Sequence, residues 1–215
     1  CIRDRYNIMD QPILFEYTSA AVPIIDELKP TFLSYDENNF IQTPSLLIQY
    51  IHISQGKRSN QNLRNATSHV FYVLDGEGTT IYLNGEINWK QGDVFTLPSY
   101  NLHAIHRCSE DSILFYANDS PLLNFLHVNP SKPRFLPTHY KCDIMLKQIE
   151  EFNNEEDAKI RNRNGILLSN KRMVEEKLNT LTHTMWSLLN SISPDTVQKP
   201  HKHNSIAVDL SLIHI

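Results

Sequence analysis

The sequence predicts a mainly β protein whose best-defined part is a small barrel or sandwich of short strands. Three observations support this fold class. Residues 45–126 contain short runs rich in β-branched and aromatic side chains, close turns separate these runs, and no helical pattern intervenes. The hydrophobic fraction of 40% also supplies enough apolar side chains for a folded core.

The predicted strands follow one another closely along the chain. A first strand is expected over residues 45–54, and a polar loop over 56–68 follows it. The later strands, separated by turns or loops, are expected over residues 69–74, 79–83, 86–90, 94–97 and 112–116. Asn84-Gly85 is a strong signal for a two-residue hairpin turn between two of these strands.

Prolines and charges divide the rest of the chain. Frequent prolines in residues 1–44 predict an irregular arm with short elements, and residues 45–126 form the first barrel. Prolines and a charged stretch in residues 127–178 predict a polar linker with a short helix near 143–151. A pattern typical of β-strands follows, so residues 179–215 are expected to begin a second, incomplete barrel.

Charge and cysteine usage exclude several classes of protein. The chain has 215 residues with 20 Lys and Arg against 24 Asp and Glu, a net charge of −4. This balance does not suit a nucleic-acid binder, and no apolar run is long enough to span a membrane. Cys1, Cys108 and Cys142 form no C-x-x-C pattern. We therefore expect a cytoplasmic protein without disulfides or a thiolate zinc site.

Several single residues have predicted positions. Trp89 and Trp186 follow the strand pattern and are expected in the core. His52 lies in an apolar strand and is expected to be a hydrogen-bonded core or edge residue. His106 follows His103 by three residues, so alternation predicts that it points to the opposite side, towards the surface or rim.

The motif in residues 92–98, Gly-Asp-Val-Phe-Thr-Leu-Pro, followed by His103, is similar to the second conserved motif of the cupins. Residues 72–78, ending in Asp-Gly-Glu-Gly, resemble the end of the first cupin motif. The resemblance implies a double-stranded β-helix, or jelly-roll barrel, in which His103 points into the barrel mouth.

Two further segments resemble one group of cupins. Residues 113–126 look like the segment that closes the first cupin of the gentisate 1,2-dioxygenase and 1-hydroxy-2-naphthoate dioxygenase group, and residues 199–205 resemble a metal-binding motif of that group. These proteins are two-barrel (bicupin), ring-cleaving iron dioxygenases. The resemblance implies Fe(II), a small aromatic or organic acid as substrate, and a homo-oligomer.

The resemblance implies metal ligands in the second barrel. His201 and His203 form a His-x-His pair, a spacing that places both imidazoles on one face of a strand. The third histidine of the family would lie beyond residue 215. The alternative is an exposed basic pair, since Lys199 and Lys202 are neighbours.

The first barrel departs from the family pattern. The two family histidines fall on Leu63 and Asn65, the usual glutamate ligand falls on His69, and only His103 stays in place. A site made of His69 and His103, with Asn65, is one interpretation. The other is a degenerate barrel whose histidines hydrogen-bond or face solvent.

Three functions remain open on the sequence. The first is a non-heme Fe(II) dioxygenase of hydroxylated aromatic acids. The second is a non-catalytic cupin that binds or senses a small organic acid, which the loss of ligands at Leu63 and Asn65 favours. The third is an isomerase-type cupin, which no particular residue indicates.

Overall fold

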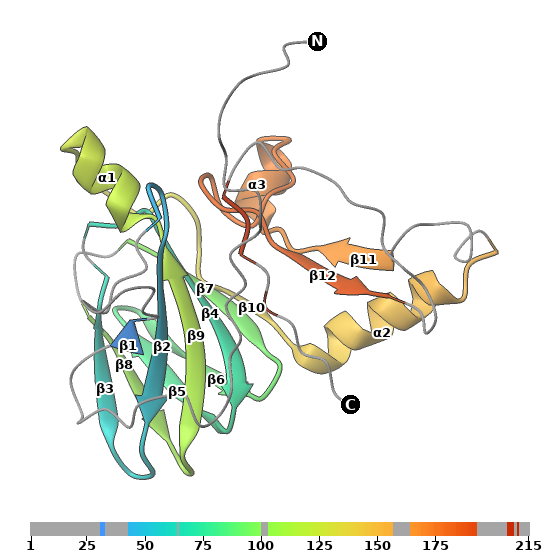
Figure 1. Cartoon of the computed structure of the whole chain (residues 1–215), viewed down its shortest axis with the longest axis horizontal. Coiled ribbons are helices and arrows are strands. Elements are labelled where there is room, and N and C mark those ends of the chain that lie inside the picture. The colour runs from blue at the N-terminus through green and yellow to red at the C-terminus, as the bar shows by residue number, and fades with distance from the viewer. Residues whose placement is uncertain are drawn as a thin grey trace, which may run out of the picture.

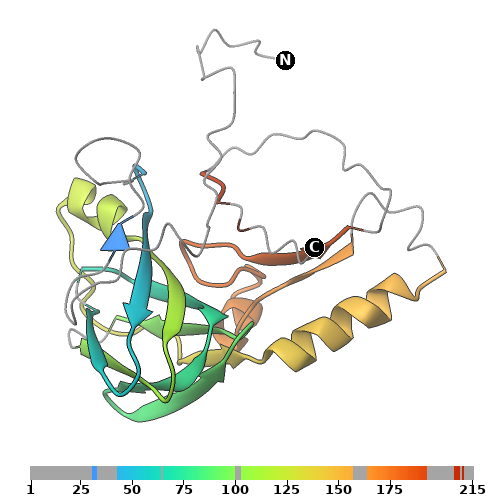
Figure 2. The same ribbon diagram turned by 60° about the horizontal axis from the view of Figure 1, so that its bottom comes forward.

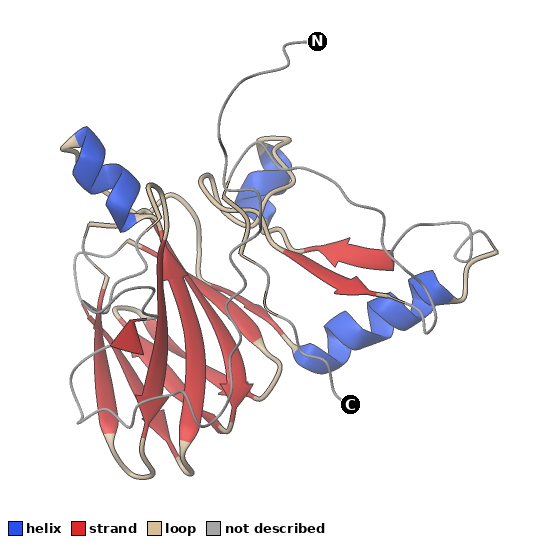
Figure 3. Ribbon diagram, viewed as in Figure 1, coloured by secondary structure: helices blue, strands red, loops and turns tan. Residues whose placement is uncertain are grey.

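The computed structural model describes residues 31–32, 43–63, 65–99, 103–156, 164–192, 206–208 and 210. Strands dominate the first half of this part of the chain, and the longer helices lie outside the strand-rich body (Figure 3). The predicted mainly β architecture is confirmed. No helix among the described residues is long and apolar enough to cross a membrane.

The barrel strands lie largely where the sequence predicted them. In chain order they are β1 (Thr31–Phe32), β2 (Leu47–Ile53), β3 (Arg58–Asn62), β4 (Ser68–Asp75), β5 (Glu77–Tyr82), β6 (Gly85–Lys90), β7 (Val94–Pro98), β8 (His103–Cys108) and β9 (Ser112–Asn118). Three strands were not predicted: β1 lies in the expected irregular arm, β8 lies between two predicted strands, and β3 occupies the expected polar loop. The composition of β3 is polar because only one of its residues, Gln61, is buried.

The strands form two antiparallel sheets that face each other (Figures 1 and 2). The larger sheet has the order β1-β2-β9-β4-β7-β10, in which β10 (Thr138–Tyr140) joins from beyond the barrel segment. The smaller sheet has the order β3-β8-β5-β6. Partners distant in sequence, such as β2 with β9, therefore lie side by side, as in a cupin jelly roll.

The barrel core lies between the two sheets. Side chains alternate along each strand, so every second residue points inward. These buried residues form one cluster: Ile51, Ile53, Leu63, Phe71, Val73, Ile87, Trp89, Phe95, Leu97, Ala104, Cys108, Leu114 and Tyr116. The prediction that Trp89 belongs to the core is confirmed.

The predicted hairpin between β5 and β6 is present, with its turn shifted by one residue. Tyr82 pairs with Gly85, so the two turn residues are Leu83 and Asn84. Glycine at position 85 lets the Tyr82 side chain lie close to the backbone: a Cβ on Gly85 would be 2.9 Å from the Tyr82 hydroxyl. The Asn-Gly signal thus located the hairpin correctly and its turn residues one position too late.

The chain beyond the barrel is folded. Its elements are α1 (Ser120–Leu126), α2 (Cys142–Asn153), β11 (Asn164–Leu167), α3 (Lys171–Glu175) and β12 (Leu188–Ser191). The short helix expected near residue 143 is α2. Met145 and Ile149 are its buried residues, one turn apart, so one stripe of the helix faces inward.

A second hydrophobic cluster joins this part of the chain to the barrel. Val94, Met145, Ile149, Ile166, Leu168 and Leu181 form its buried centre, and Val70, Tyr72, Tyr140 and Leu189 pack against it. Val70, Tyr72 and Val94 belong to the outer face of the larger sheet. The segment expected as a polar linker therefore contributes to a buried core, because Met145, Ile149, Ile166 and Leu168 meet the outer face of the barrel there.

The start of the expected second barrel is only partly described. β12 pairs with β11, within the segment expected as a linker. The prediction that Trp186 lies in the core is wrong: its side chain is 55% exposed, because the strand begins two residues later at Leu188. His201 and His203 lie outside the described residues.

Candidate metal centre

The two candidate ligands of the first barrel lie in different surroundings. His69, on β4, is fully buried inside the barrel. His103, the first residue of β8, is exposed. His201 and His203 belong to the part of the chain outside the described residues, so the structure says nothing of the pair.

Both ring nitrogens of His69 are hydrogen-bonded. Nε2 lies 3.1 Å from the Leu63 carbonyl oxygen, and Nδ1 lies 2.7 Å from the Tyr116 hydroxyl. Since a carbonyl only accepts, Nε2 carries the proton and Nδ1 accepts from Tyr116. The side chains of Gln61 and Asn118 also hydrogen-bond to the Tyr116 hydroxyl. No lone pair of His69 is therefore free for a metal.

Burial fixes the protonation states of this pair. Desolvation lowers the pKa of His69 from 6.5 to about 3, although the Leu63 carbonyl opposes the shift. Desolvation raises the pKa of Tyr116 above its ordinary value. The imidazole therefore stays neutral and the phenol stays protonated, which preserves the hydrogen bond between them at neutral pH.

The positions of the two family histidines offer no ligand. Leu63 is fully buried in the barrel core, where its side chain packs and its carbonyl holds His69. Asn65 is exposed in a turn, with a positive φ of 60°. An asparagine tolerates this left-handed conformation better than most residues.

Alternation along β8 reverses the predicted roles of its two histidines. Ala104 and His106 are fully buried, and His103 and Arg107 are exposed. The expectation that His103 points into the barrel mouth is therefore wrong, and so is the expectation that His106 faces the surface or rim. The sequence showed that His103 and His106 point to opposite faces of the strand, but it did not show which of the two points inward.

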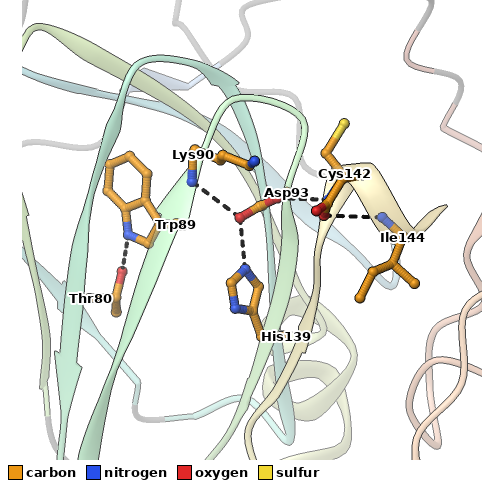
Figure 4. Close-up of polar contacts among 8 residues, drawn as sticks. Thr80, Trp89, Lys90, Asp93, His139, Cys142 and Ile144 are labelled. Atoms are coloured by element: carbon orange, nitrogen blue, oxygen red, sulfur yellow. Dashed lines mark hydrogen bonds and ion pairs between the residues drawn. The ribbon is translucent and has the colours of Figure 1, made fainter. Parts of the chain in front are cut away.

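His106 is held by a short hydrogen-bonded chain inside the barrel. The indole nitrogen of Trp89 donates to the Thr80 hydroxyl at 2.8 Å, and that hydroxyl lies 2.7 Å from Nδ1 of His106 (Figure 4 shows the Trp89–Thr80 contact). The Thr80 hydroxyl thus links the indole of Trp89 to Nδ1 of His106.

The remaining nitrogen of His106 has no polar partner among the described residues. Nε2 is buried without a hydrogen bond in the described structure, and the imidazole lies at a centroid distance of 5.1 Å from Phe71, tilted by 60°. Burial lowers the pKa of His106 to about 3, so it too stays neutral.

Aromatic stacking fills the barrel around these histidines. Phe71 stacks on Phe95 and on Tyr116, with 4.7 Å between ring centroids in each pair. Among the described residues no group of three or more His, Cys, Asp or Glu side chains could hold a metal ion. The first barrel, in its described part, therefore does not fit an iron site of the family type.

The structure draws attention to a residue with no role in the sequence-based prediction, Asp93. Its buried carboxylate accepts from the backbone N–H of Lys90 at 3.1 Å and of Cys142 at 2.8 Å, and it pairs with Nε2 of His139 at 2.8 Å (Figure 4). Asp93 thus joins the β6–β7 turn to β10 and α2. Its sequence signal is an acidic residue between a turn glycine and a fully buried strand, Val94–Pro98.

A surface hollow of about 430 Å³ lies beside this junction. It is lined by Asp75, Gly76, Glu77, Lys90, Gln91, Glu110, Cys142, Asp143 and Leu146. Four carboxylates against one lysine make the hollow negative, so it repels an aromatic carboxylate. Burial raises the pKa of the Cys142 thiol, with the Asp93 carboxylate acting in the same direction, so the thiol stays protonated.

His52 also differs from its predicted role. Its side chain is half-buried on β2, and its Nδ1 is buried without a partner in the described structure. The expectation of a fully hydrogen-bonded histidine is therefore wrong for this nitrogen.

Comparisons with known proteins support the cupin interpretation. No family model matches the chain. A 5-aminosalicylate 1,2-dioxygenase from Comamonas sp is 32% identical over 72 residues, which are 34% of this chain and 19% of that protein. The chain thus spans about a fifth of the length of this curated relative.

Solved structures of two kinds also match. A salicylate 1,2-dioxygenase from Pseudaminobacter salicylatoxidans is 21% identical, with a TM-score of 0.35 over 43% of this chain and 26% of that one. A cupin-2 domain protein from Shewanella frigidimarina is 10% identical, with a TM-score of 0.34 over 45% of this chain and 84% of that one. The identity to the Comamonas protein, together with the jelly-roll topology, supports the resemblance to the gentisate 1,2-dioxygenase-like group of cupins.

Proposed function

We propose that the chain belongs to a bicupin dioxygenase that cleaves the ring of hydroxylated aromatic acids. The observation that carries this proposal is the 32% identity over 72 residues to a 5-aminosalicylate 1,2-dioxygenase. The name of that relative indicates the substrate class, a salicylate-type acid with a ring hydroxyl beside a carboxylate. The relative's extra length leaves room for a second barrel.

In this proposal the two barrels divide the work. The first barrel is a support, since both ring nitrogens of His69 and Nδ1 of His106 are hydrogen-bonded inside the barrel and His103 is exposed. The iron would be held by His201 and His203, together with a third ligand. When bound, such a metal supplies open coordination positions and Lewis-acid activation for the acid and for dioxygen.

The surroundings proposed for the protein follow from composition. Three cysteines without a C-x-x-C pattern suit the reducing cytoplasm. We propose that it acts there as a homo-oligomer on a small acid, with no role for nucleic acid.

The test uses the complete natural protein, loaded anaerobically with Fe(II). Oxygen uptake is followed with 5-aminosalicylate, salicylate and gentisate, and bound iron is measured by mass spectrometry. His201→Ala and His203→Ala should each lose most of the iron and about 100-fold or more in oxygen uptake. The matched control, His103→Ala, should retain both.

Two results would overturn the proposal. One is iron that stays bound in the double variant His201→Ala/His203→Ala and leaves only when His103 is replaced. The other is an iron-loaded protein that consumes no oxygen with any of the three acids. The first result would return the metal to the first barrel, and the second would remove the dioxygenase activity.

A second candidate is a non-catalytic cupin that binds a small organic acid. The absence of a three-ligand cluster among the described residues favours it. The discriminating measurement is calorimetric titration of the metal-free protein with salicylate. Binding at unchanged affinity with and without iron, and no oxygen uptake, would select this candidate.

A further inference from the structure

The outer face of the four-stranded sheet carries an ordered row of polar side chains. Register places Arg58 of β3 opposite Arg107 of β8, Arg107 opposite Thr79 of β5, and Thr79 opposite Asn88 of β6. Arg58, Arg107 and Asn88 are exposed and Thr79 is half-buried. The four residues therefore form one line across all four strands.

The first two members of this row repel each other. Residues directly opposite on neighbouring antiparallel strands have their Cβ atoms about 5 Å apart, and like charges in such positions destabilise a sheet. Neither guanidinium has an ion-pair or hydrogen-bond partner among the residues that the structure describes. The sheet thus holds two adjacent cations without a direct partner on a chain whose net charge is −4.

The rest of the row carries the Thr79 hydroxyl and the Asn88 amide, while two carboxylates lie in the neighbouring rows towards β6: Glu77, which accepts from Ser109, and Glu86, opposite Ile81. The Thr79 hydroxyl donates to Oδ1 of Asn88 at 2.7 Å, which occupies that oxygen and leaves the amide N–H groups of Asn88 to point elsewhere. In the next row Ile81 lies opposite Ile105, and both are half-buried. A line of hydrogen-bond donors therefore runs beside a small apolar pair.

We propose that this face, formed by Arg58, Arg107, Thr79, Asn88, Ile81 and Ile105, docks an acidic segment of a partner protein. Two neighbouring guanidinium groups can each form bidentate hydrogen bonds with a carboxylate. Opposite charge on the partner would turn their mutual repulsion into attraction. The face is the surface of a sheet rather than a concave pocket, which suits a protein segment better than a small molecule.

The probe for this proposal is a fluorescein-labelled peptide with the sequence Gly-Glu-Glu-Ile-Phe-Glu-Glu-Gly, titrated with the 215-residue chain while its anisotropy is followed. Arg58→Glu and Arg107→Glu should each weaken binding about tenfold or more. Arg107→Lys should weaken binding less than Arg107→Glu, because lysine keeps the positive charge. Some loss should remain, because lysine cannot form the bidentate hydrogen bonds of a guanidinium. Lys132→Glu, the same charge change in an exposed loop, should alter affinity less than twofold.

Stability gives an independent readout. If the two cations repel, Arg58→Glu should raise the thermal unfolding midpoint by about 1–3 °C while it weakens binding. Lys132→Glu should not raise it. A variant that binds less and unfolds earlier would point to a damaged sheet, so this combination of signs overturns the proposal.

Three other outcomes would also overturn it. One is no binding at 50 mM salt, and another is equal binding of a control peptide with glutamine in place of glutamate. The third is self-association: if the chain forms a dimer in light scattering that Arg107→Glu dissolves, the face serves a second copy of this chain and not a foreign acidic segment.

Discussion

The molecule contains two buried cores that differ in how they are closed. The barrel core lies between two sheets and includes histidine, tyrosine and threonine side chains that hydrogen-bond to one another. The second core lies between the outer face of one sheet and the α2, β11 and β12 elements, and its members are apolar apart from two tyrosines at its border. One core is enclosed by the barrel, and the other depends on docking.

This difference has a physical consequence. The barrel core is surrounded by long antiparallel ladders such as β2–β9 and β4–β9, so it can open only if the barrel unfolds. The second core is attached by the three-residue strand β10 and by the Asp93 carboxylate. We therefore expect the second core to detach first and the barrel to survive its loss.

The largest expected effect is the truncation of Phe71, the central ring of the barrel stack. Phe71→Ala should lower the free energy of unfolding by about 3–5 kcal/mol, because it removes a fully buried ring and leaves a cavity. The matched change in the second core, Met145→Ala, should cost about 2–4 kcal/mol. Urea unfolding measures both, and hydrogen exchange shows where each acts.

The strands and helices in which hydrogen exchange increases show whether the two cores unfold separately. Phe71→Ala should raise exchange throughout β4, β7 and β9, whereas Met145→Ala should raise it in α2 and β11 only. If Met145→Ala raises exchange in the barrel strands to the same degree, then the two cores unfold as one unit and the distinction between them fails.

The second prediction uses the two histidines that only the barrel core contains. The pKa of His69 and of His106 is about 3 in the folded chain against 6.5 in the unfolded one. Stability is therefore complete above pH 6.5 and falls as pH decreases towards 3, since only the unfolded chain binds the protons. At pH 5 each histidine should cost about 2 kcal/mol.

The measurement is the urea midpoint between pH 7.5 and pH 5, a range in which most carboxylates do not yet titrate. His106→Asn should remove about half of the loss, after correction for its own effect at pH 7.5. The loss should appear in the exchange of barrel strands before that of α2. A midpoint that stays constant over this range would show that the histidines are not buried as neutral groups.

The two cores also differ in how far the sequence predicted them. The barrel strands were predicted because their signals are local: alternating apolar residues, glycine turns and the Asn84-Gly85 hairpin. The second core was not, because Met145, Ile149 and Ile166 lie in short apolar runs of a charged stretch, and nothing local shows that these particular residues meet the outer face of the barrel. Contacts between distant segments have no local signal.

The candidate site shows the same limit. The motif spacing identified His103 and His69 as residues to examine, and it identified Leu63 as the lost ligand. It could not give the side of β8 that faces inward, because His103 and His106 lie three apart and a shift of one residue exchanges their roles. Two of the three partners of Asp93, Cys142 and His139, come about 50 residues later in the chain, so no local pattern indicates that it links distant segments.

The third prediction cuts the link between the two cores. Asp93→Asn keeps the size of the side chain but replaces a carboxylate oxygen by a donor that faces other donors, so it should cost about 2 kcal/mol. Hydrogen exchange should increase in β10 and α2, while β4 and β9 keep their protection. Exchange that increases first in β4 would make Asp93 a part of the barrel core instead of the link.

The smallest expected effect concerns the solvent face of α2. Lys147 and Glu151 form an exposed i,i+4 pair with 4.0 Å between Nζ and the carboxylate oxygen. Lys147→Ala should change the free energy of unfolding by less than about 0.5 kcal/mol, as exposed pairs of this kind contribute little. Set beside Met145→Ala on the inner face of the same helix, this near-zero value would show that docking, not the helix itself, holds α2 in place. A loss above about 1 kcal/mol, measured in the same urea titration, would mean instead that α2 is stable by its own side-chain pairs.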